Sequence, residues 1–155
     1  MASLSSGRVF IGCCGTVNVL YTLGIALRHS MMRRQFNDSP NSAETLLIDY
    51  SLHQHRLFTR FSETIHHFLG GWRMQKIWMN NLPKLDDEKN PVNELCHGLS
   101  SAQKAFSTWS GQEVMNECWK ALGGLGFSHY ANIAFVMYNQ DINQTFEGDN
   151  DVLLM

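Results

Sequence analysis

A run of 19 residues without a charged side chain covers residues 9–27, VFIGCCGTVNVLYTLGIAL, between Arg8 and Arg28. A helix of about 20 apolar residues can cross a bilayer, and a signal-peptide core has a similar character. Three glycines and Asn18 dilute this run, and the flanking arginines favour neither orientation in a membrane. Because a helix at the centre of a bundle is apolar on all sides, we predict a buried helix and no stable membrane insertion.

Helical patterns and polar loops alternate along the rest of the chain, and no strand-like alternation persists. Residues 36–42 and 80–91 are predicted loops because they are rich in Asn, Asp, Ser and Pro or carry several charges. Glycines at residues 123–127 predict a helix end, and Ser128 is the predicted N-cap of the helix that follows. The predicted helices cover residues 9–34, 45–78, 92–122 and 129–140. Four helices joined by polar loops predict a single all-α bundle over residues 1–155.

The second of these helices carries apolar residues at spacings of one, three and four, which predicts one buried face. This face consists of Leu57, Phe58, Phe61, Ile65, Phe68 and Leu69. Gly70 and Gly71 are expected to weaken or bend the helix before it continues from Trp72 to Trp78.

Composition argues against several classes of function. A net charge of -2 leaves no excess of Lys and Arg for binding nucleic acid. The four cysteines contain no CxxC spacing, and adjacent Cys13 and Cys14 rarely pair, so neither a disulfide framework nor a thiolate zinc site is expected. Histidines stand at 53, 55, 66 and 67, and ligands on a helix converge at spacings of three or four, so we predict no metal site.

Three further pieces stay ambiguous when read residue by residue. GGLGF, residues 123–127, is either a helix stop or a place where a ligand approaches the backbone; without a preceding strand it is neither a Rossmann turn nor a P-loop. Arg33 and Arg34 are either a charge pair at a helix end or a phosphate-binding pair. Glu147, in TFEGDN, is either a solvated charge or a functional carboxylate.

The order of these three pieces resembles that in acyl-CoA oxidases and dehydrogenases. Residues 7–36, GRVFIGCCGTVNVLYTLGIALRHSMMRRQF, resemble the helix that opens the C-terminal α-helical part of these enzymes. ECWKALGGLGF, residues 117–127, is similar to the oxidase motif ECREACGGHGY. DINQTFEGDN, residues 141–150, resembles the catalytic stretch that ends in TYEGDN, and EGDN is typical of oxidases whereas dehydrogenases carry EGT. The resemblance implies the fold of the first C-terminal α-domain of peroxisomal acyl-CoA oxidases.

The resemblance also implies a role for each matching residue. Glu147 matches the catalytic base that removes the α-proton of a fatty acyl-CoA, and Arg8 and Gly148 match residues beside it at the substrate. In the family, FAD takes the β-hydrogen as hydride to give a trans-2-enoyl-CoA, and O2 then becomes H2O2 in this step of fatty acid β-oxidation. The implied FAD contacts are Arg33, Gln54, Gly123 and Gly124. Because the family binds FAD across a subunit boundary, a homodimer is implied.

The chemistry explains why a carboxylate is needed at this position. An α-proton is weakly acidic until hydrogen-bond donors polarise the thioester carbonyl and stabilise the developing enolate. A carboxylate that has lost its water to the bound acyl chain is a stronger base and can then remove the proton.

Some positions depart from the family pattern. Trp119, Leu125, Phe127 and Phe146 replace the usual Arg, His, Tyr and Tyr. These changes concern FAD affinity and substrate placement, and they favour an alternative function as a non-catalytic dimerisation or regulatory module derived from an oxidase. Family members are much longer, so we expect a fragment or isolated domain, without the N-terminal helical, β and last C-terminal domains and inactive alone. The resemblance implies a peroxisomal location, although the chain has no C-terminal SKL-type signal.

Overall fold

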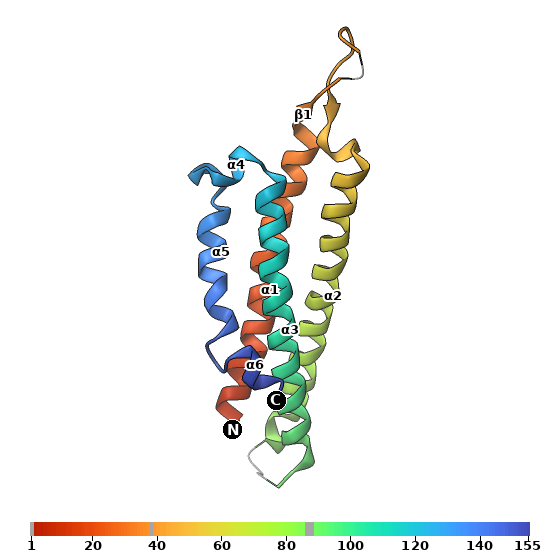
Figure 1. Ribbon diagram of the computed structural model, residues 1–155. Helices are drawn as coiled ribbons and strands as arrows, with labels where there is room; N and C mark the ends of the chain where they lie inside the picture. The colour runs from red at the N-terminus through yellow and green to blue at the C-terminus, as the bar shows by residue number, and fades with distance from the viewer. Residues whose placement is uncertain (1, 38, 86–88) are drawn as a thin grey trace.

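The structure, a computed structural model, describes residues 2–37, 39–85 and 89–155, with side chains from Ser5 onward (Figure 1). Asp38 and residues 86–88 of the two predicted loops lie outside the described residues. The described helices of four or more residues are α1 (Ala2–Met32), α2 (Ser51–Asn81), α3 (Pro91–Ala121), α4 (Gly124–Phe127), α5 (Ile133–Asp141) and α6 (Asn150–Leu153). The all-α prediction is confirmed.

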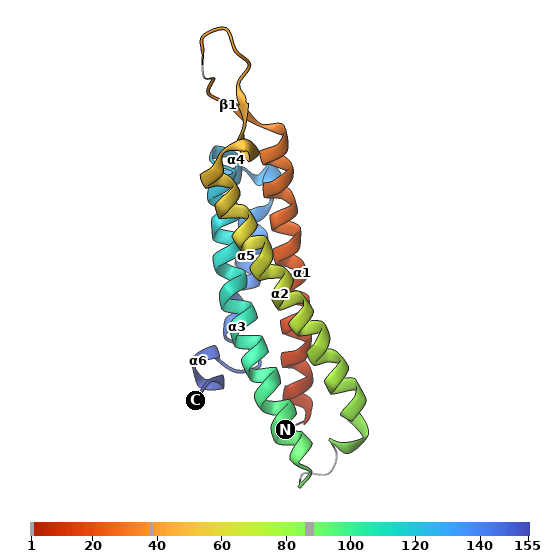
Figure 2. The same cartoon turned by 90° about the vertical axis from the view of Figure 1, so that its right-hand side faces the viewer.

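Helix α1 lies at the centre of the bundle. It packs against α2 and α3 along most of its length, and α5 covers the side where α1 and α3 meet (Figures 1 and 2). The largest buried apolar cluster joins three of these helices and consists of Val19, Leu23, Ala26, Leu57, Val114, Met115, Cys118 and Ala121. The apolar run at residues 9–27 is therefore the central helix of a bundle.

Hydroxyl groups inside α1 are satisfied within the helix itself. Thr16, Thr22 and Ser30 each donate to the carbonyl four residues earlier, at 2.7 to 3.0 Å. The helix over residues Ser5–Met32 is long and apolar enough to cross a membrane, and an 18-residue window in it has a mean hydropathy of 1.7. Half of that window is buried inside the bundle. Burial against α2 and α3 is the environment that a helix with these polar interruptions requires.

The start of α2 differs from the prediction. Residues 45–50 do not open the helix, because Thr45 pairs with Gln35 in a two-residue antiparallel ladder between β1 (Arg34–Gln35) and β2 (Thr45–Leu46). A 3₁₀ turn, η1 (Leu47–Asp49), follows before α2 begins at Ser51. The periodicity of α2 was visible in the sequence, whereas the short hairpin has too few residues for a strand pattern.

Helix α2 is continuous across Gly70 and Gly71, so the predicted break is absent. The two glycines allow neighbouring helices to approach closely: a Cβ on Gly71 would lie 3.4 Å from Sγ of Cys13, and one on Gly70 would lie 2.9 Å from Oε1 of Gln103. Packing against α1 and α3 offsets the low helix propensity of the glycine pair.

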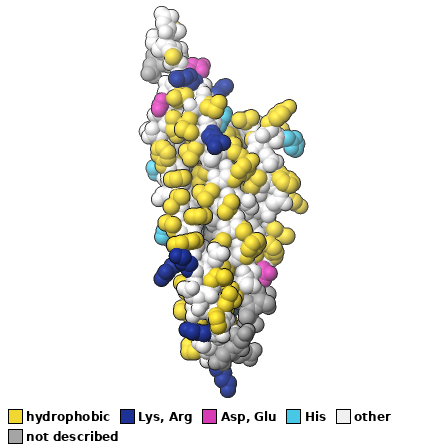
Figure 3. Space-filling view, turned by 180° about the vertical axis from the view of Figure 1, so that it is seen from behind, with side chains coloured by type: hydrophobic (Ala, Val, Ile, Leu, Met, Phe, Trp, Pro, Cys, Tyr) yellow, Lys and Arg dark blue, Asp and Glu magenta, His cyan; other side chains and the backbone are white. Residues whose placement is uncertain are grey.

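The predicted buried face of α2 is wrong at four of its six positions, and Ile65 is half-buried. Leu57 is fully buried, but Phe58, Phe61, Phe68 and Leu69 are 40 to 55% exposed. The buried positions of α2 are Leu57, Thr64, Gly71, Met74 and Trp78. Thr64 and Gly71 share this seam with three large apolar residues, and the other large apolar residues of α2 lie on the surface, where they contribute to the apolar exterior visible in Figure 3.

Helix α3 agrees with the prediction to within one residue at each end. The Asn90 side chain accepts a 3.1 Å hydrogen bond from the backbone of Val92 and so caps its N-terminus. Ser128 is an N-cap as predicted, but the turn that it caps is η3 (His129–Ala131). Asn132 then adopts φ +56°, which separates this turn from α5.

Candidate functional site

Glu147 lies in a tight turn between η4 (Ile142–Gln144) and α6. Its φ is +59°, a left-handed value that is uncommon for residues other than glycine, and Gly148 follows with φ +114°. Side-chain-bearing residues rarely adopt the latter value, so Gly148 is required by the backbone itself. Two consecutive positive φ angles turn the Glu147 side chain back toward α1, and such backbone strain is typical of functional sites.

The Glu147 carboxylate packs directly on the backbone of α1. A Cβ built on Gly7 would lie 2.5 Å from Cδ of Glu147, which means that only glycine leaves room for the carboxylate here. Glu147 as a whole is half-buried, and its Oε2 atom is buried without a hydrogen-bond partner. A buried carboxylate oxygen without a donor is rare and costly in proteins, and it remains free to accept a proton or a hydrogen bond.

A groove of about 260 Å³ runs from this carboxylate between α1 and the α5–η4 segment. Phe10, Ile11 and Phe146 give the groove apolar walls, and the polar groups in its lining come mainly from Asn18, Asn139 and Asn143. A small set of polar groups within an apolar lining is typical of sites for organic ligands.

Arg8 lies beneath the turn and is 7% exposed. Its Nε donates a 2.9 Å hydrogen bond to the backbone carbonyl of Glu147. Its Nη1 donates to Oγ of Ser101 at 3.2 Å and lies 3.0 Å from Nδ1 of His97. The structure therefore brings Arg8, Glu147 and Gly148 together, but the guanidinium forms its hydrogen bonds with the turn backbone and α3.

Lys104, on α3, is a residue of this site that sequence reasoning missed. It is fully buried, and its Nζ donates to the carbonyls of Gln144 (3.1 Å) and Gly148 (2.6 Å) and to Oδ1 of Asn150 (2.8 Å). Burial lowers the pKa of Lys104, and the negative charges of Asp149 and Glu147 act against that shift. The available signal was spacing, because Lys104 stands four residues from Ser100 and four from Thr108, on the buried face of α3.

The other predicted site residues lie at the opposite end of the bundle. Arg33 is exposed just beyond α1, and its carbonyl accepts from the backbone of Leu47 at 2.9 Å. Gln54 is half-buried in the first turn of α2. Gly123 has φ +56° after α3, and a Cβ on Gly123 or Gly124 would meet no atom within 4 Å.

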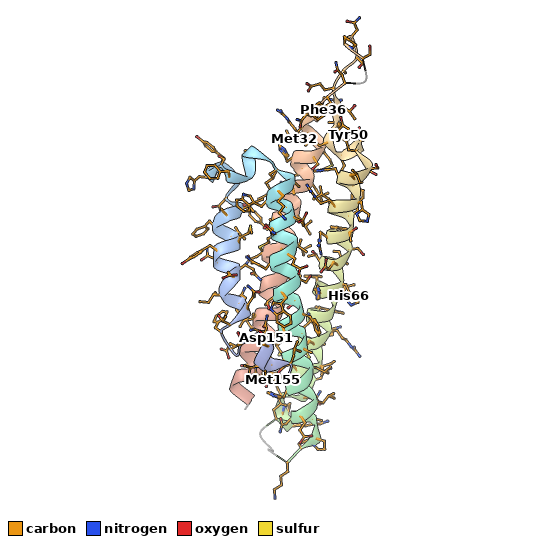
Figure 4. All side chains as sticks on the ribbon, viewed as in Figure 1. Met32, Phe36, Tyr50, His66, Asp151 and Met155 are labelled. Atoms are coloured by element: carbon orange, nitrogen blue, oxygen red, sulfur yellow. The ribbon has the colours of Figure 1, made fainter. Side chains whose placement is uncertain are left out.

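Figures 1, 2 and 4 show the two ends. The hairpin, α4 and the labelled Met32, Phe36 and Tyr50 lie at one end, and α6 with Asp151 and Met155 lies toward the other. Arg8 and Met32 are separated along α1 by about 36 Å at 1.5 Å per residue. Small-molecule pockets of about 300 to 1,000 Å³ are much shorter than that. Glu147 and the Arg33 end of one chain therefore cannot line a single such pocket.

The next residues to consider are the histidines and cysteines. His53 lies 2.7 Å from Oγ of Ser30, and burial lowers the pKa of His53, with a smaller effect from Arg56. All four cysteines are free thiols, and burial raises the pKa of Cys118 to about 12. Within the described part of the chain, no three His, Cys, Asp or Glu side chains are grouped so that they could hold a metal ion.

Comparison with known proteins identifies the family of this chain. Residues 1–155 match the family model described as acyl-CoA oxidase, C-alpha1 domain. Acyl-coenzyme A oxidase 3, peroxisomal, from Arabidopsis thaliana is 34% identical over 99% of this chain. The chain spans 22% of the length of that relative.

Solved structures give the same result. Acyl-CoA oxidase-1 of Caenorhabditis elegans, complexed with FAD and ATP, superposes with a TM-score of 0.91 at 25% identity over 97% of this chain and 23% of its own. Acyl-CoA oxidase1 of Yarrowia lipolytica superposes with a TM-score of 0.89 at 30% identity over 97% of this chain and 24% of its own.

Proposed function

The chain belongs to the acyl-CoA oxidase family, as its C-alpha1 domain, and on that premise we propose that it contributes the catalytic base of a FAD-dependent oxidation of fatty acyl-CoA. The reaction would form a trans-2-enoyl-CoA and reduce O2 to H2O2. The observation that carries this proposal is the Glu147 carboxylate, which borders a groove with one buried oxygen that has no hydrogen-bond donor.

Glu147 is suited to the proton-transfer half of the reaction. The apolar part of the groove would receive acyl chain and displace water, which makes a carboxylate a stronger base. Because Oε2 makes no hydrogen bond to the protein, no donor has to be released before it takes the α-proton. Arg8 acts through the backbone, since its hydrogen bond to the Glu147 carbonyl holds the turn in place.

The residues at the other end of the bundle fit an anionic cofactor such as FAD. Arg33 presents an exposed guanidinium, which binds phosphate in bidentate geometry. Gly123 and Gly124 leave open space beside the backbone, so phosphate oxygens could approach the chain closely there. Gln54 adds an amide at the same end. When bound, FAD supplies the acceptor for the β-hydrogen and its electron pair.

The separation of the two ends supports a homodimer. A cofactor held by Arg33, Gln54 and the glycines of one chain would lie about 36 Å along α1 from the Glu147 end of that chain, too far for one site. A second copy that brings its Glu147 end to this surface would complete the site. A symmetric dimer would then contain two equivalent composite sites.

Replacing Glu147 tests the proposal. In a complete, flavin-loaded oxidase that contains this domain, Glu147→Gln should lower the rate of acyl-CoA-dependent H2O2 formation by about 10² to 10⁴-fold, because general-base catalysis contributes that much. The flavin absorbance spectrum should still show bound FAD, since Glu147 is not among the proposed FAD contacts. An unaltered rate in this variant would show that the base is another residue.

A second candidate function is a non-catalytic module that dimerises with, or regulates, a complete oxidase. The indole of Trp119 favours it, since a Cβ on Gly126 would lie 2.5 Å from that ring, so the ring lies beside the glycine-rich turn. A bulky group there reduces the room for a cofactor. A colourless preparation that does not take up FAD would support this function, and a yellow one would support the oxidase.

The names of relatives support a peroxisomal location. The Arabidopsis thaliana relative and a human one, peroxisomal acyl-coenzyme A oxidase 3, are both named for that organelle. We extend the location to this chain as part of the same proposal, and co-localisation of the tagged protein with a peroxisomal marker tests it.

A further inference from the structure

Lys104 is the only lysine among the described residues that is fully buried, and every hydrogen of its ammonium group has an acceptor. An ammonium group has three N–H donors. The acceptors are the carbonyl oxygens of Gln144 and Gly148 and the Oδ1 atom of Asn150, at 2.6 to 3.1 Å. This complete set of hydrogen bonds offsets part of the high cost of removing a charged group from water.

All three acceptors belong to the segment that carries Glu147. The Gln144 carbonyl precedes Glu147 in the chain, the Gly148 carbonyl follows it, and Asn150 begins α6. Lys104 therefore forms hydrogen bonds with the turn on both sides of Glu147. A buried side chain that donates to two carbonyls across a turn with positive φ angles restricts the turn to one conformation.

Asn150 connects the same turn to α3 by further hydrogen bonds. It is 2% exposed, and its Nδ2 donates to Oγ1 of Thr108 at 2.9 Å and to the carbonyl of Ala105 at 3.4 Å. The Lys104 and Thr108 side chains are one turn apart on α3, so the turn is anchored to a long helix at two successive levels. Arg8 holds the Glu147 carbonyl from α1.

We propose that Lys104, with Asn150 and Thr108, is the positioning residue that holds Glu147 in the orientation needed for proton removal. Lys104 does not line the groove, and its ammonium group donates its hydrogen bonds to the turn and to α6. The catalytic role of Lys104 rests on the proposed function. Its structural role, which is to keep the Glu147 carboxylate against Gly7, can be tested separately.

Lys104→Met keeps an unbranched side chain only one heavy atom shorter and removes the charge and all three donors. We expect carbodiimide-activated coupling of glycine ethyl ester to Glu147, followed by mass spectrometry, to become about tenfold faster than in the wild type, because losing hydrogen bonds to a charged group shifts local opening by that order. Glu113, whose side chain is 69% exposed, serves as the internal reference and should be labelled at an unchanged rate.

Val114→Ala is the matched control. Val114 is fully buried on the same helix, so its truncation lowers stability through a cavity, but it lies in the α1–α3 core cluster away from the turn. Faster labelling of Glu147 in Lys104→Met and not in Val114→Ala supports the proposal. Equal labelling of Glu147 in all three proteins overturns it.

Thr108→Val is a milder variant for the case that Lys104→Met does not fold. It preserves the shape of the side chain and removes the hydroxyl that accepts from Asn150 and donates to helix carbonyls, and we expect a smaller increase in Glu147 labelling. In the flavin-loaded oxidase, both variants should lower kcat and leave KM within about twofold, since positioning acts on the transition state. If Glu147→Gln keeps its activity, the proposed function fails while the labelling still decides what Lys104 holds.

Discussion

Glycine at position 7 decides where the Glu147 carboxylate can lie. The Glu147 side chain occupies the space that a Cβ at residue 7 would fill, so a residue on α1 and a residue 140 positions later share one small volume. Nothing in the local sequence around Gly7 indicates this, because a glycine inside a helix is usually explained by close helix packing. At the scale of single residues, the candidate site depends on the absence of one methyl group.

Gly7→Ala should displace the carboxylate and lower acyl-CoA-dependent H2O2 formation by about tenfold or more, since small misplacements of a catalytic group cost that much. The free energy of unfolding should change little, because the better helix propensity of alanine, about 1 kcal/mol, offsets part of the clash. The rate and the thermal midpoint of the same preparation are the two measurements.

Gly24→Ala is the control for that substitution. Gly24 is on the same helix, and a Cβ there would meet no atom within 4 Å. This variant should be slightly more stable with an unchanged rate. A loss of activity in Gly24→Ala equal to that in Gly7→Ala would mean that the effect comes from α1 in general and not from contact with Glu147.

Helices α1 and α3 pack closely at Gly111. A Cβ on Gly111 would lie 2.9 Å from Cγ2 of Val19, which is 2% exposed and β-branched, so it has little freedom to move aside. Next to this contact, the buried amide of Gln140 from α5 accepts hydrogen bonds from Asn18 and Asn143. Gly111 allows α1 and α3 to approach closely, and the Gln140 side chain connects α5 to α1 by a hydrogen bond with Asn18.

Gly111→Ala should lower the free energy of unfolding by about 1 to 3 kcal/mol, the usual cost of overpacking a core, less the gain in helix propensity. Chemical denaturation followed by circular dichroism measures it. Gly98→Ala, on the same helix with open space around the new methyl group, should be neutral or stabilising. Destabilisation of both variants to the same extent would contradict the close contact at Gly111.

At the scale of the whole molecule, the predicted site residues divide between two ends of one bundle. Glu147, Arg8 and Gly148 gather near the chain termini, and Arg33, Gln54, Gly123 and Gly124 lie at the hairpin end (Figure 1). A composite site between two copies uses both ends of each chain, whereas a site within one chain would leave one set without a role.

Subunit mixing tests this arrangement. Glu147→Gln and Arg33→Ala should each be inactive alone, the first through loss of the base and the second through loss of the cofactor contact. When equal amounts are unfolded and refolded together, about half of the dimers are hybrids with one intact site of two, so activity should return to about a quarter of the wild-type value. No recovery, with hybrid dimers demonstrated by mass spectrometry, would place both residues in one subunit's site.

The sequence alone determined the class of fold and the family, because both depend on patterns that are local. Helical periodicity over 155 residues and three ordered motifs were sufficient for an all-α bundle of the acyl-CoA oxidase family. The positions of Glu147, the helix-end glycines and Arg33 could be named for the same reason, and their roles stay proposals.

Only the tertiary structure decided which surfaces are buried and what holds the turn at Glu147. In α2 the phenylalanines lie on the surface and the buried seam includes Thr64 and Gly71, because neighbouring helices, and not the sequence of α2, set which face is covered. Lys104 and Gly7 belong to the site through contacts with residues more than 40 positions away. Such contacts form only once separate helices are packed together, and no local pattern carries them.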